Sequence, residues 1–314
     1  MIKRLGRKFS TALLLLLGAC GMVARCSEPD PLDIAAIDAL YERPAEPVGG
    51  PLRVFHLGHS LVGRDMPAML QQLAPDGHRY ESQLGWGSVL KSHWDPKVEI
   101  NGFEVENAHP RYRDAHEAIE SAEYDALVVT EAVEIRDSIK FHDSGKMLHN
   151  WAEKAHSQDP SARVYFYETW HELDDPEGWL ERLDTDLSKY WEGEILHKAL
   201  AYETDAKPIY VIPGGQVMAR FVRAVEASGG IGQIKSRTDL FKDKIHFNDL
   251  GAYLMALTHY AVLYQSSPIG LPHSLLKADG SAAVDPGPEA ADLMQRIVWQ
   301  TVTGYAKTGV QDDP

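Results

Sequence analysis

The chain has 314 residues, of which 44% are hydrophobic and 25% are charged, and its formal net charge is −15 at pH 7. These proportions are ordinary for a globular protein and exclude a fibrous or disordered chain. A strongly acidic surface repels phosphate backbones, so we expect no nucleic-acid partner. The two cysteines, Cys20 and Cys26, lie near the start, so a disulfide framework or a cysteine nucleophile in the body of the chain is excluded.

The first nineteen residues have the features of a targeting segment. Basic residues precede an apolar core at 12–19 that is too short to span a bilayer. The core ends in LLGAC, which resembles the lipobox of bacterial lipoproteins and would make Cys20 the lipidated residue. We therefore expect a signal peptide at 1–19 and an exported protein of the cell envelope, attached to a membrane only through this lipid. Ordinary signal-peptidase cleavage and secretion are the alternative.

A tether and then a single domain are expected after the targeting segment. Residues 20–50 carry several prolines and end in two glycines, which suits a tether, and no later linker divides residues 51–314. Within this domain, β-type apolar runs occur at 52–57, 79–84, 126–130, 163–168 and 208–212.

Stretches with helical periodicity alternate with these runs. Helices are expected after Asp65, around Trp151, from Leu250 to Tyr264 and, at the end, over 288–305. Strands that alternate with helices imply right-handed crossovers and a parallel sheet covered on both faces. We predict a three-layer α/β/α fold around a parallel, flavodoxin-like sheet of about five strands. Active sites of such sheets lie beyond the carboxyl ends of the strands.

The sequence RVFHLGHSLVG places a serine, Ser60, directly after the first expected strand. A serine in this position is often only a turn residue. The Gly-x-Ser-x-Gly pattern of α/β-hydrolases is absent because Val62 takes its last position. A hydroxyl at a strand end is nevertheless well placed to act as a nucleophile if a base lies near it.

A second pair of residues, Asp243 and His246, stands just before the third expected helix. Their spacing lets the carboxylate hydrogen-bond the imidazole and fix its tautomer, while the other ring nitrogen faces outward as a base. A helix-capping Asp beside a partly exposed His is the alternative interpretation.

These pieces together resemble the SGNH, or GDSL-type, hydrolase family over residues 52–264. The first block of that family is Gly-Asp-Ser or Gly-Asn-Ser after the first strand, and here it is Gly58, His59 and Ser60. The last block is Asp-x-x-His before a closing helix, as at Asp243 to His246. The second block is a glycine whose N–H helps to hold the oxyanion, and LGWGSVL offers Gly85, with Gly87 as the competing choice.

The resemblance implies a serine esterase that needs no cofactor. Ser60 would attack an ester carbonyl, His246 would accept and return its proton, and Asp243 would orient His246. The N–H groups of Ser60 and Gly85 would hold the developing oxyanion. Together with the expected envelope address, this suggests a small acyl ester as substrate, such as an acetyl group on a carbohydrate.

The third block of the family, Gly-x-Asn-Asp, is missing. Its Asn donates to the oxyanion, but the corresponding stretch here reads VVTEAVEIRDS and holds Glu131. An ionised Glu cannot donate a hydrogen bond. Glu131 is therefore a candidate to bind a substrate hydroxyl. The alternative is a structural role, paired with Arg136 or with a helix N-terminus.

His59 and Trp86 are the other candidates for substrate contacts. His59 lies next to the expected nucleophile, with a packed turn as the alternative, and Trp86, Trp94 and Trp170 could offer stacking platforms for sugars. These aromatics underlie a second interpretation, an SGNH-fold lipoprotein that binds a glycan after losing catalysis. A third interpretation keeps the same residues for acyl transfer, which differs from hydrolysis in how the site excludes water.

A metal site is the remaining alternative. His56 and His59 stand three apart, and ETWHELDD offers His171 beside acidic residues. The sequence has no His-Glu-x-x-His motif, and the acidic residues suit a solvated loop at a strand end. We therefore expect no metal.

Overall fold

The computed structural model describes residues 33–203 and 206–312. The predicted signal peptide, Cys20 and the first part of the predicted tether lie outside these residues. None of the described helices is both long and apolar enough to cross a bilayer.

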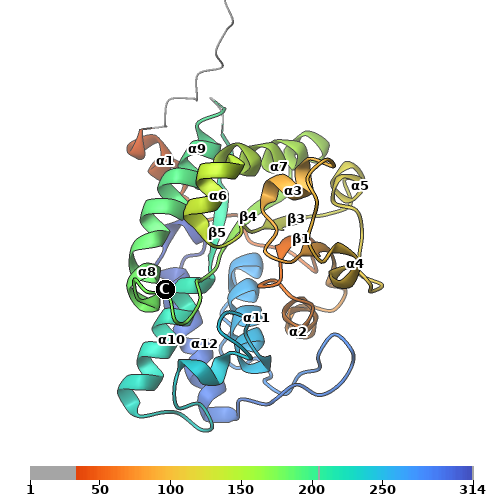
Figure 1. Cartoon of the computed structure of the whole chain (residues 1–314). Helices are drawn as coiled ribbons and strands as arrows, with labels where there is room; N and C mark the ends of the chain where they lie inside the picture. The colour runs from red at the N-terminus through yellow and green to blue at the C-terminus, as the bar shows by residue number, and fades with distance from the viewer. Residues whose placement is uncertain (1–32, 204–205, 313–314) are drawn as a thin grey trace, which may run out of the picture.

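Five parallel strands form one sheet in the order β2-β1-β3-β4-β5 (Figure 1). The strands are β1 (Arg53–His59), β2 (Arg79–Gly85), β3 (Ala126–Val129), β4 (Arg163–Glu168) and β5 (Ile209–Pro213). Each lies within two residues of its predicted position, because apolar runs bounded by turn residues mark buried parallel strands clearly. The predicted α/β fold class and flavodoxin-like strand order are confirmed.

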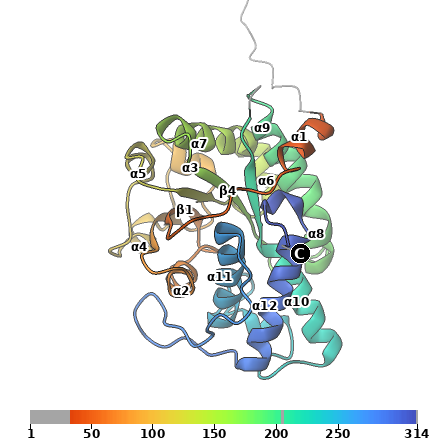
Figure 2. The same ribbon diagram turned by 180° about the vertical axis from the view of Figure 1, so that it is seen from behind.

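Helices cover both faces of this sheet (Figures 1 and 2). One face carries α2 (Asp65–Leu73), α10 (Gly214–Ser228), α11 (Asp249–Tyr264) and α12 (Pro288–Thr303). The other carries α3 (Leu90–Trp94), α5 (Ala115–Glu120), α6 (Ile135–His142), α7 (Ser144–Gln158), the π-helical η1 (Leu187–Leu196) and α9 (His197–Leu200). The helix α8 (Trp179–Asp186) leads directly into η1, but its Trp179 and Leu183 pack into the core of the first face, next to α10. Short elements complete the chain: α1 (Ile34–Leu40), α4 (Phe103–Glu106), η2 (Arg237–Leu240) and η3 (Ala306–Thr308).

Alternate side chains of each strand enter two separate cores. In β1, Val54 packs with α2 and α11, whereas Phe55 and Leu57 pack with α3 and α7. This alternation follows from the two-residue period of a strand, and it makes the strands apolar on both faces. The sheet is therefore held from both sides, and its strand ends are rigid points for functional side chains.

The described end of the predicted tether differs from the expectation. Residues 34–40 form α1, Ile37 is fully buried, and the Tyr41 hydroxyl donates to the carbonyl of Ile209 at 2.8 Å. The N–H of Ala45 donates to the carbonyl of Gly309 at 2.9 Å. The prolines of this stretch suggested a loose segment, but two apolar side chains and these backbone contacts pack it against β5 and the C-terminal end.

Candidate active site

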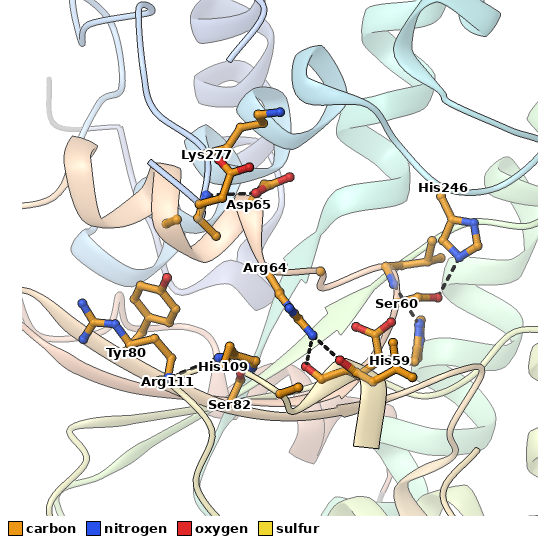
Figure 3. A pocket seen from close by; sticks show the side chains of 18 of the residues that line it. His59, Ser60, Arg64, Asp65, Tyr80, Ser82, His109, Arg111, His246 and Lys277 are labelled. Carbon is orange, nitrogen blue, oxygen red and sulfur yellow. Dashed lines mark hydrogen bonds between the residues drawn. The ribbon is translucent and has the colours of Figure 1, made fainter. Parts of the chain in front are cut away.

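Ser60 lies at the point where the sheet reverses its winding. β1 pairs with β2 on one side and with β3 on the other, so the connections after β1 and β3 leave toward opposite faces of the sheet. A crevice forms at such a position beyond the strand ends. Ser60 follows β1 directly and lines a cavity of about 1470 Å³ (Figure 3).

The turn that carries Ser60 is packed tightly against β3 and against the segment after β2. A Cβ atom on Gly58 would lie 2.4 Å from Cγ2 of Thr130, so this position requires glycine. The Gly58 carbonyl accepts hydrogen bonds from Oγ of Ser88 and Nε2 of His93, both at 2.9 Å. These contacts fix the end of β1 two residues before the hydroxyl.

Ser60, His246 and Asp243 form a chain of hydrogen bonds. Oγ of Ser60 lies 2.8 Å from Nε2 of His246 (Figure 3). Nδ1 of His246 lies 2.8 Å from Oδ2 of Asp243. With Nδ1 donating to the carboxylate, Nε2 is free to accept the proton of the serine. The structure therefore brings Ser60 together with Asp243 and His246, two predicted site residues that lie 183 and 186 positions later in the chain.

Asp243 is ionised in this arrangement. Burial alone would raise its pKa, but its carboxylate accepts the backbone N–H groups of His246 and Ile245 and the His246 ring, which lowers the pKa to about 2. The two backbone bonds, 2.7 Å to His246 and 2.9 Å to Ile245, also bend the loop so that the carboxylate faces the imidazole. The short Asp-x-x-His spacing thus explains the local geometry.

The loop that carries His246 is held by its neighbours. The N–H of Lys242 donates to the carbonyl of His246 at 2.9 Å, and the side chain of Asn248 caps α11 immediately afterwards. Nε1 of Trp170 donates to the carbonyl of Ile245 at 2.8 Å. Trp170 is fully buried, so the idea that it stacks on a sugar is wrong, and it positions the histidine loop instead.

Glu131 does not reach the cavity. Its side chain is fully buried, and Oε1 accepts the N–H of Leu90 at 3.2 Å and the N–H of Ala132 at 2.8 Å. Burial raises the pKa of this carboxyl to about 7, although the N–H donors lower it. The candidate role in substrate binding is not supported. The alternative holds instead, because Leu90 is the first residue of α3 and Arg136 pairs with Glu134.

His59 lines the cavity but both of its ring nitrogens are already in use. Nδ1 accepts the N–H of Leu61 at 3.3 Å, so Nε2 carries the proton and donates to the carbonyl of Glu131 at 3.0 Å. Burial lowers the pKa of His59 to about 4, which keeps the ring neutral. It is therefore a packed turn residue that connects the ends of β1 and β3, and a substrate contact through its nitrogens would break these bonds.

The segment after β2 presents Trp86 and Gly87 to the cavity. Gly85 is buried and is not among the lining residues, because Ile100, Ser88 and Asn101 crowd the space that its side chain would take. Trp86 is 50% exposed, and its Nε1 donates to Glu106 at 2.7 Å. Of the three tryptophans considered as platforms, only Trp86 lines the cavity, since Trp94 packs edge-on against Trp151.

The histidines considered as metal ligands, His56, His59 and His171, are not arranged to bind a metal ion. His56 and His59 are three positions apart on an extended strand and point to opposite faces. His171 does lie within 4.8 Å of Glu134 and Asp175, but both carboxylates bind the guanidinium of Arg182, which supplies the positive charge in this cluster. The donor set thus suits an ion-pair network, not a cation site.

Several residues of the cavity were not found from the sequence. Arg64 begins the turn into α2, and Arg111 lies on the segment between α4 and α5. Residues 276–280 of the segment before α12 also form part of the wall, where the N–H of Ala278 donates to Asp65 at 2.9 Å (Figure 3). Isolated arginines and a Pro- and Gly-rich segment have no periodic signal that would place them beside Ser60.

Comparison with solved structures supports the fold. A DUF4886 family protein from Bacteroides uniformis superimposes with a TM-score of 0.53 at 14% identity, over 80% of this chain and 95% of that one. A provisionally named GDSL-like lipase from Parabacteroides merdae has a TM-score of 0.42 at 12% identity, over 68% and 96% of the two chains. A TM-score of 0.42 does not establish a common fold. No family model and no curated protein matches the sequence.

Proposed function

We propose that this protein is an SGNH-type serine esterase that hydrolyses a small acyl ester. The proposal rests on one observation, the two 2.8 Å hydrogen bonds that join Ser60, His246 and Asp243 at the end of β1. A nucleophile, a base and a group that orients the base are the complete set for acyl transfer through a serine.

In the reaction, the Ser60 hydroxyl attacks the ester carbonyl while Nε2 of His246 takes its proton. Asp243 stabilises the imidazolium that forms, and its low pKa keeps it charged throughout. The tetrahedral intermediate then expels the alcohol, which receives the proton from His246, and leaves an acyl group on Ser60. A water molecule activated by the same histidine releases the acid and restores the serine.

The oxyanion would be held by backbone N–H groups. Among the described residues, neither the N–H of Ser60 nor that of Gly87 has a hydrogen-bond acceptor, and both residues line the cavity. We therefore propose Gly87, the competing choice in the sequence, in place of the buried Gly85. The side-chain donor of the usual third block is missing, and one such donor typically contributes about 100- to 1000-fold in rate.

The proposed substrate is an acyl, for instance acetyl, ester on a carbohydrate. The exposed ring of Trp86, which lines the same cavity as Ser60, supports this because aromatic faces stack on sugar rings. The expected envelope address through residues 1–19 and Cys20 supports it as well. A glycan-binding protein without catalysis would have no need of the aligned base. Acyl transfer to a second hydroxyl uses the same residues and differs only in its product.

The test is hydrolysis of p-nitrophenyl acetate together with labelling by a fluorophosphonate probe, detected by intact mass. The protein without residues 1–26 is compared with its Ser60→Ala variant, and circular dichroism checks that both are folded. We expect turnover and a single adduct in the first and neither in the second. A folded protein with no turnover and no adduct would contradict the esterase and favour the glycan-binding alternative.

A further inference from the structure

We infer that the cavity beside Ser60 selects esters that carry an anionic group, bound by Arg64 and Arg111, and that its substrates are therefore acyl esters of acidic carbohydrates. The inference rests on the proposed esterase function for the ester group. Binding of an anion by the two guanidiniums can be tested independently of catalysis.

Arg64 lies four residues after Ser60 and is anchored to the opposite wall of the cavity. Its Nη2 donates to the carbonyls of Val105 and Glu106, the latter at 2.9 Å. Both acceptors are neutral, and no carboxylate of the described residues lies within ion-pair distance of the guanidinium. The remaining N–H groups have no protein acceptor among these residues, so the side chain is held in place with donors to spare.

Arg111 is arranged in the same way farther along the cavity (Figure 3). Its Nη2 donates to Oε1 of Gln71 at 3.2 Å, and its guanidinium carbon lies 5.0 Å from the centre of the Tyr80 ring. It also has no carboxylate partner among the described residues. Stacking on an aromatic face orients the guanidinium without neutralising it, which leaves its fork of donors for a planar carboxylate or a sulfate.

Among the described residues, no acidic residue of the cavity lies within ion-pair distance of either guanidinium. Asp65, Glu106, Asp243 and Asp279 instead accept hydrogen bonds from Ala278, Trp86, His246 and Ser281, respectively. Two charged guanidiniums inside a concave wall are stabilised by an anion that enters with the substrate.

The rim of the cavity indicates the rest of the ligand. Trp86, Val105 and Leu276 line it and are 50%, 57% and 49% exposed, respectively. Large apolar side chains that remain exposed around a polar cavity mark a binding surface. A sugar ring fits this combination because it offers apolar C–H faces to the rim while an attached carboxylate or sulfate reaches the arginines.

The catalytic test uses two esters with the same acyl group, sodium 4-acetoxybenzoate and its neutral methyl ester. We expect Arg64→Gln and Arg111→Gln each to lower the ratio of kcat/KM for the anionic ester to kcat/KM for the neutral ester about tenfold, because a charge-assisted bond is lost. Arg111→Lys should restore part of the difference, since it restores the charge. Arg223→Gln, which removes a surface arginine paired with Asp184, serves as the matched control. Equal losses on both esters, or no loss on either, would overturn the inference.

The binding test separates this inference from the esterase proposal. Calorimetry with the Ser60→Ala variant compares sodium D-glucuronate, D-glucose 6-sulfate and D-glucose. Binding of either anionic sugar that glucose does not share, and that a further Arg111→Gln substitution removes, supports the anion site even if neither ester is hydrolysed. The anionic sugar that binds more tightly shows whether the site prefers a carboxylate or a sulfate. Equal binding of all three sugars, or binding of none, would contradict the site.

Discussion

The chain segments after β1 and after β3 lie side by side at the same crevice, yet they differ in exposure and chemistry. Ser60, after β1, is partly exposed, lines the cavity and contacts His246. Glu131, after β3, is fully buried, and its carboxylate accepts backbone N–H groups of Leu90 and Ala132. A polar residue at the end of a central strand is therefore not by itself a site residue. What distinguishes Ser60 from Glu131 is access to the cavity together with a hydrogen bond to a histidine.

The two segments nevertheless depend on each other. His59, next to Ser60, donates to the carbonyl of Glu131 at 3.0 Å, and Thr130 packs against Gly58. Glu131 in turn holds the N-terminus of α3, whose His93 donates to the carbonyl of Gly58. The segment after β3 thus positions the segment after β1, and substitutions can separate the two roles.

The largest effect is expected from removing the base. His246→Ala should lower kcat by about 10,000-fold or more, because Ser60 then has no proton acceptor, and should leave the melting temperature almost unchanged. The matched control is His273→Ala, since His273 and Asp285 form a pair with a 2.7 Å contact that does not line the cavity. If both variants kept wild-type turnover of p-nitrophenyl acetate, His246 would not be the base.

A smaller loss is expected when the orienting carboxylate becomes an amide. In Asp243→Asn, the amide oxygen can still accept the N–H groups of Ile245 and His246, so the loop should keep its shape. The imidazole, however, loses the charge that stabilises its protonated form, and we expect kcat to fall about 100- to 10,000-fold. Asp285→Asn is the control. A change of less than about threefold in kcat would show that Asp243 only caps the loop.

Glu131 should affect stability and not turnover. Glu131→Ala leaves the buried N–H groups of Leu90 and Ala132 without an acceptor, which should lower the free energy of unfolding by about 1–3 kcal/mol. Glu131→Gln keeps the acceptor oxygen and should stay closer to wild type. Urea unfolding and kcat/KM are measured for both variants. A tenfold loss of kcat/KM in a variant of unchanged stability would instead place Glu131 in the chemistry.

The features that could be predicted from the sequence differ from those that could not in the same way as Ser60 differs from Glu131. The strands and long helices were predicted because buried strands and amphipathic helices leave periodic apolar patterns, and Ser60, Asp243 and His246 because their spacing within short blocks is local. Glu131 was singled out from the sequence, but its role was not predicted. The burial of its side chain depends on α3, whose Leu90 lies 41 positions earlier in the chain and donates its N–H to the Glu131 carboxylate.

The residues that form the wall of the cavity could not be predicted from periodic or local patterns. Arg64, Arg111 and residues 276–280 come from three separate segments, and contacts with α2 bring the last two together: Leu276 donates to Gln72 and Arg111 donates to Gln71. Neither arginine belongs to a pattern with a fixed spacing from Ser60. The packed helix α1 was missed for a related reason, since the seven residues IAAIDAL, with prolines before and after them, are too few to show a clear helical period.

The smallest expected effect at neutral pH concerns β1, the strand that precedes the proposed nucleophile. His56 of β1 is fully buried near His259, and neither of its ring nitrogens has a hydrogen-bond partner among the described residues. Burial lowers the pKa of His56 well below its ordinary value of 6.5. Below pH 6.5 the unfolded chain takes up a proton at this position that the folded chain does not, so stability is lost as the pH falls.

His56→Leu removes this proton uptake without removing a hydrogen bond. We expect a stability similar to wild type at pH 7.5 and a growing advantage of the variant below pH 6.5, approaching about 1.4 kcal/mol per pH unit, the value for one proton. Unfolding in urea at several pH values between 4.5 and 7.5 measures the difference. Parallel curves for the two proteins would mean that the folded chain takes up a proton at His56 over the same pH range as the unfolded chain. In that case β1 would carry a buried charge below pH 6.5, directly beneath the turn that holds Ser60.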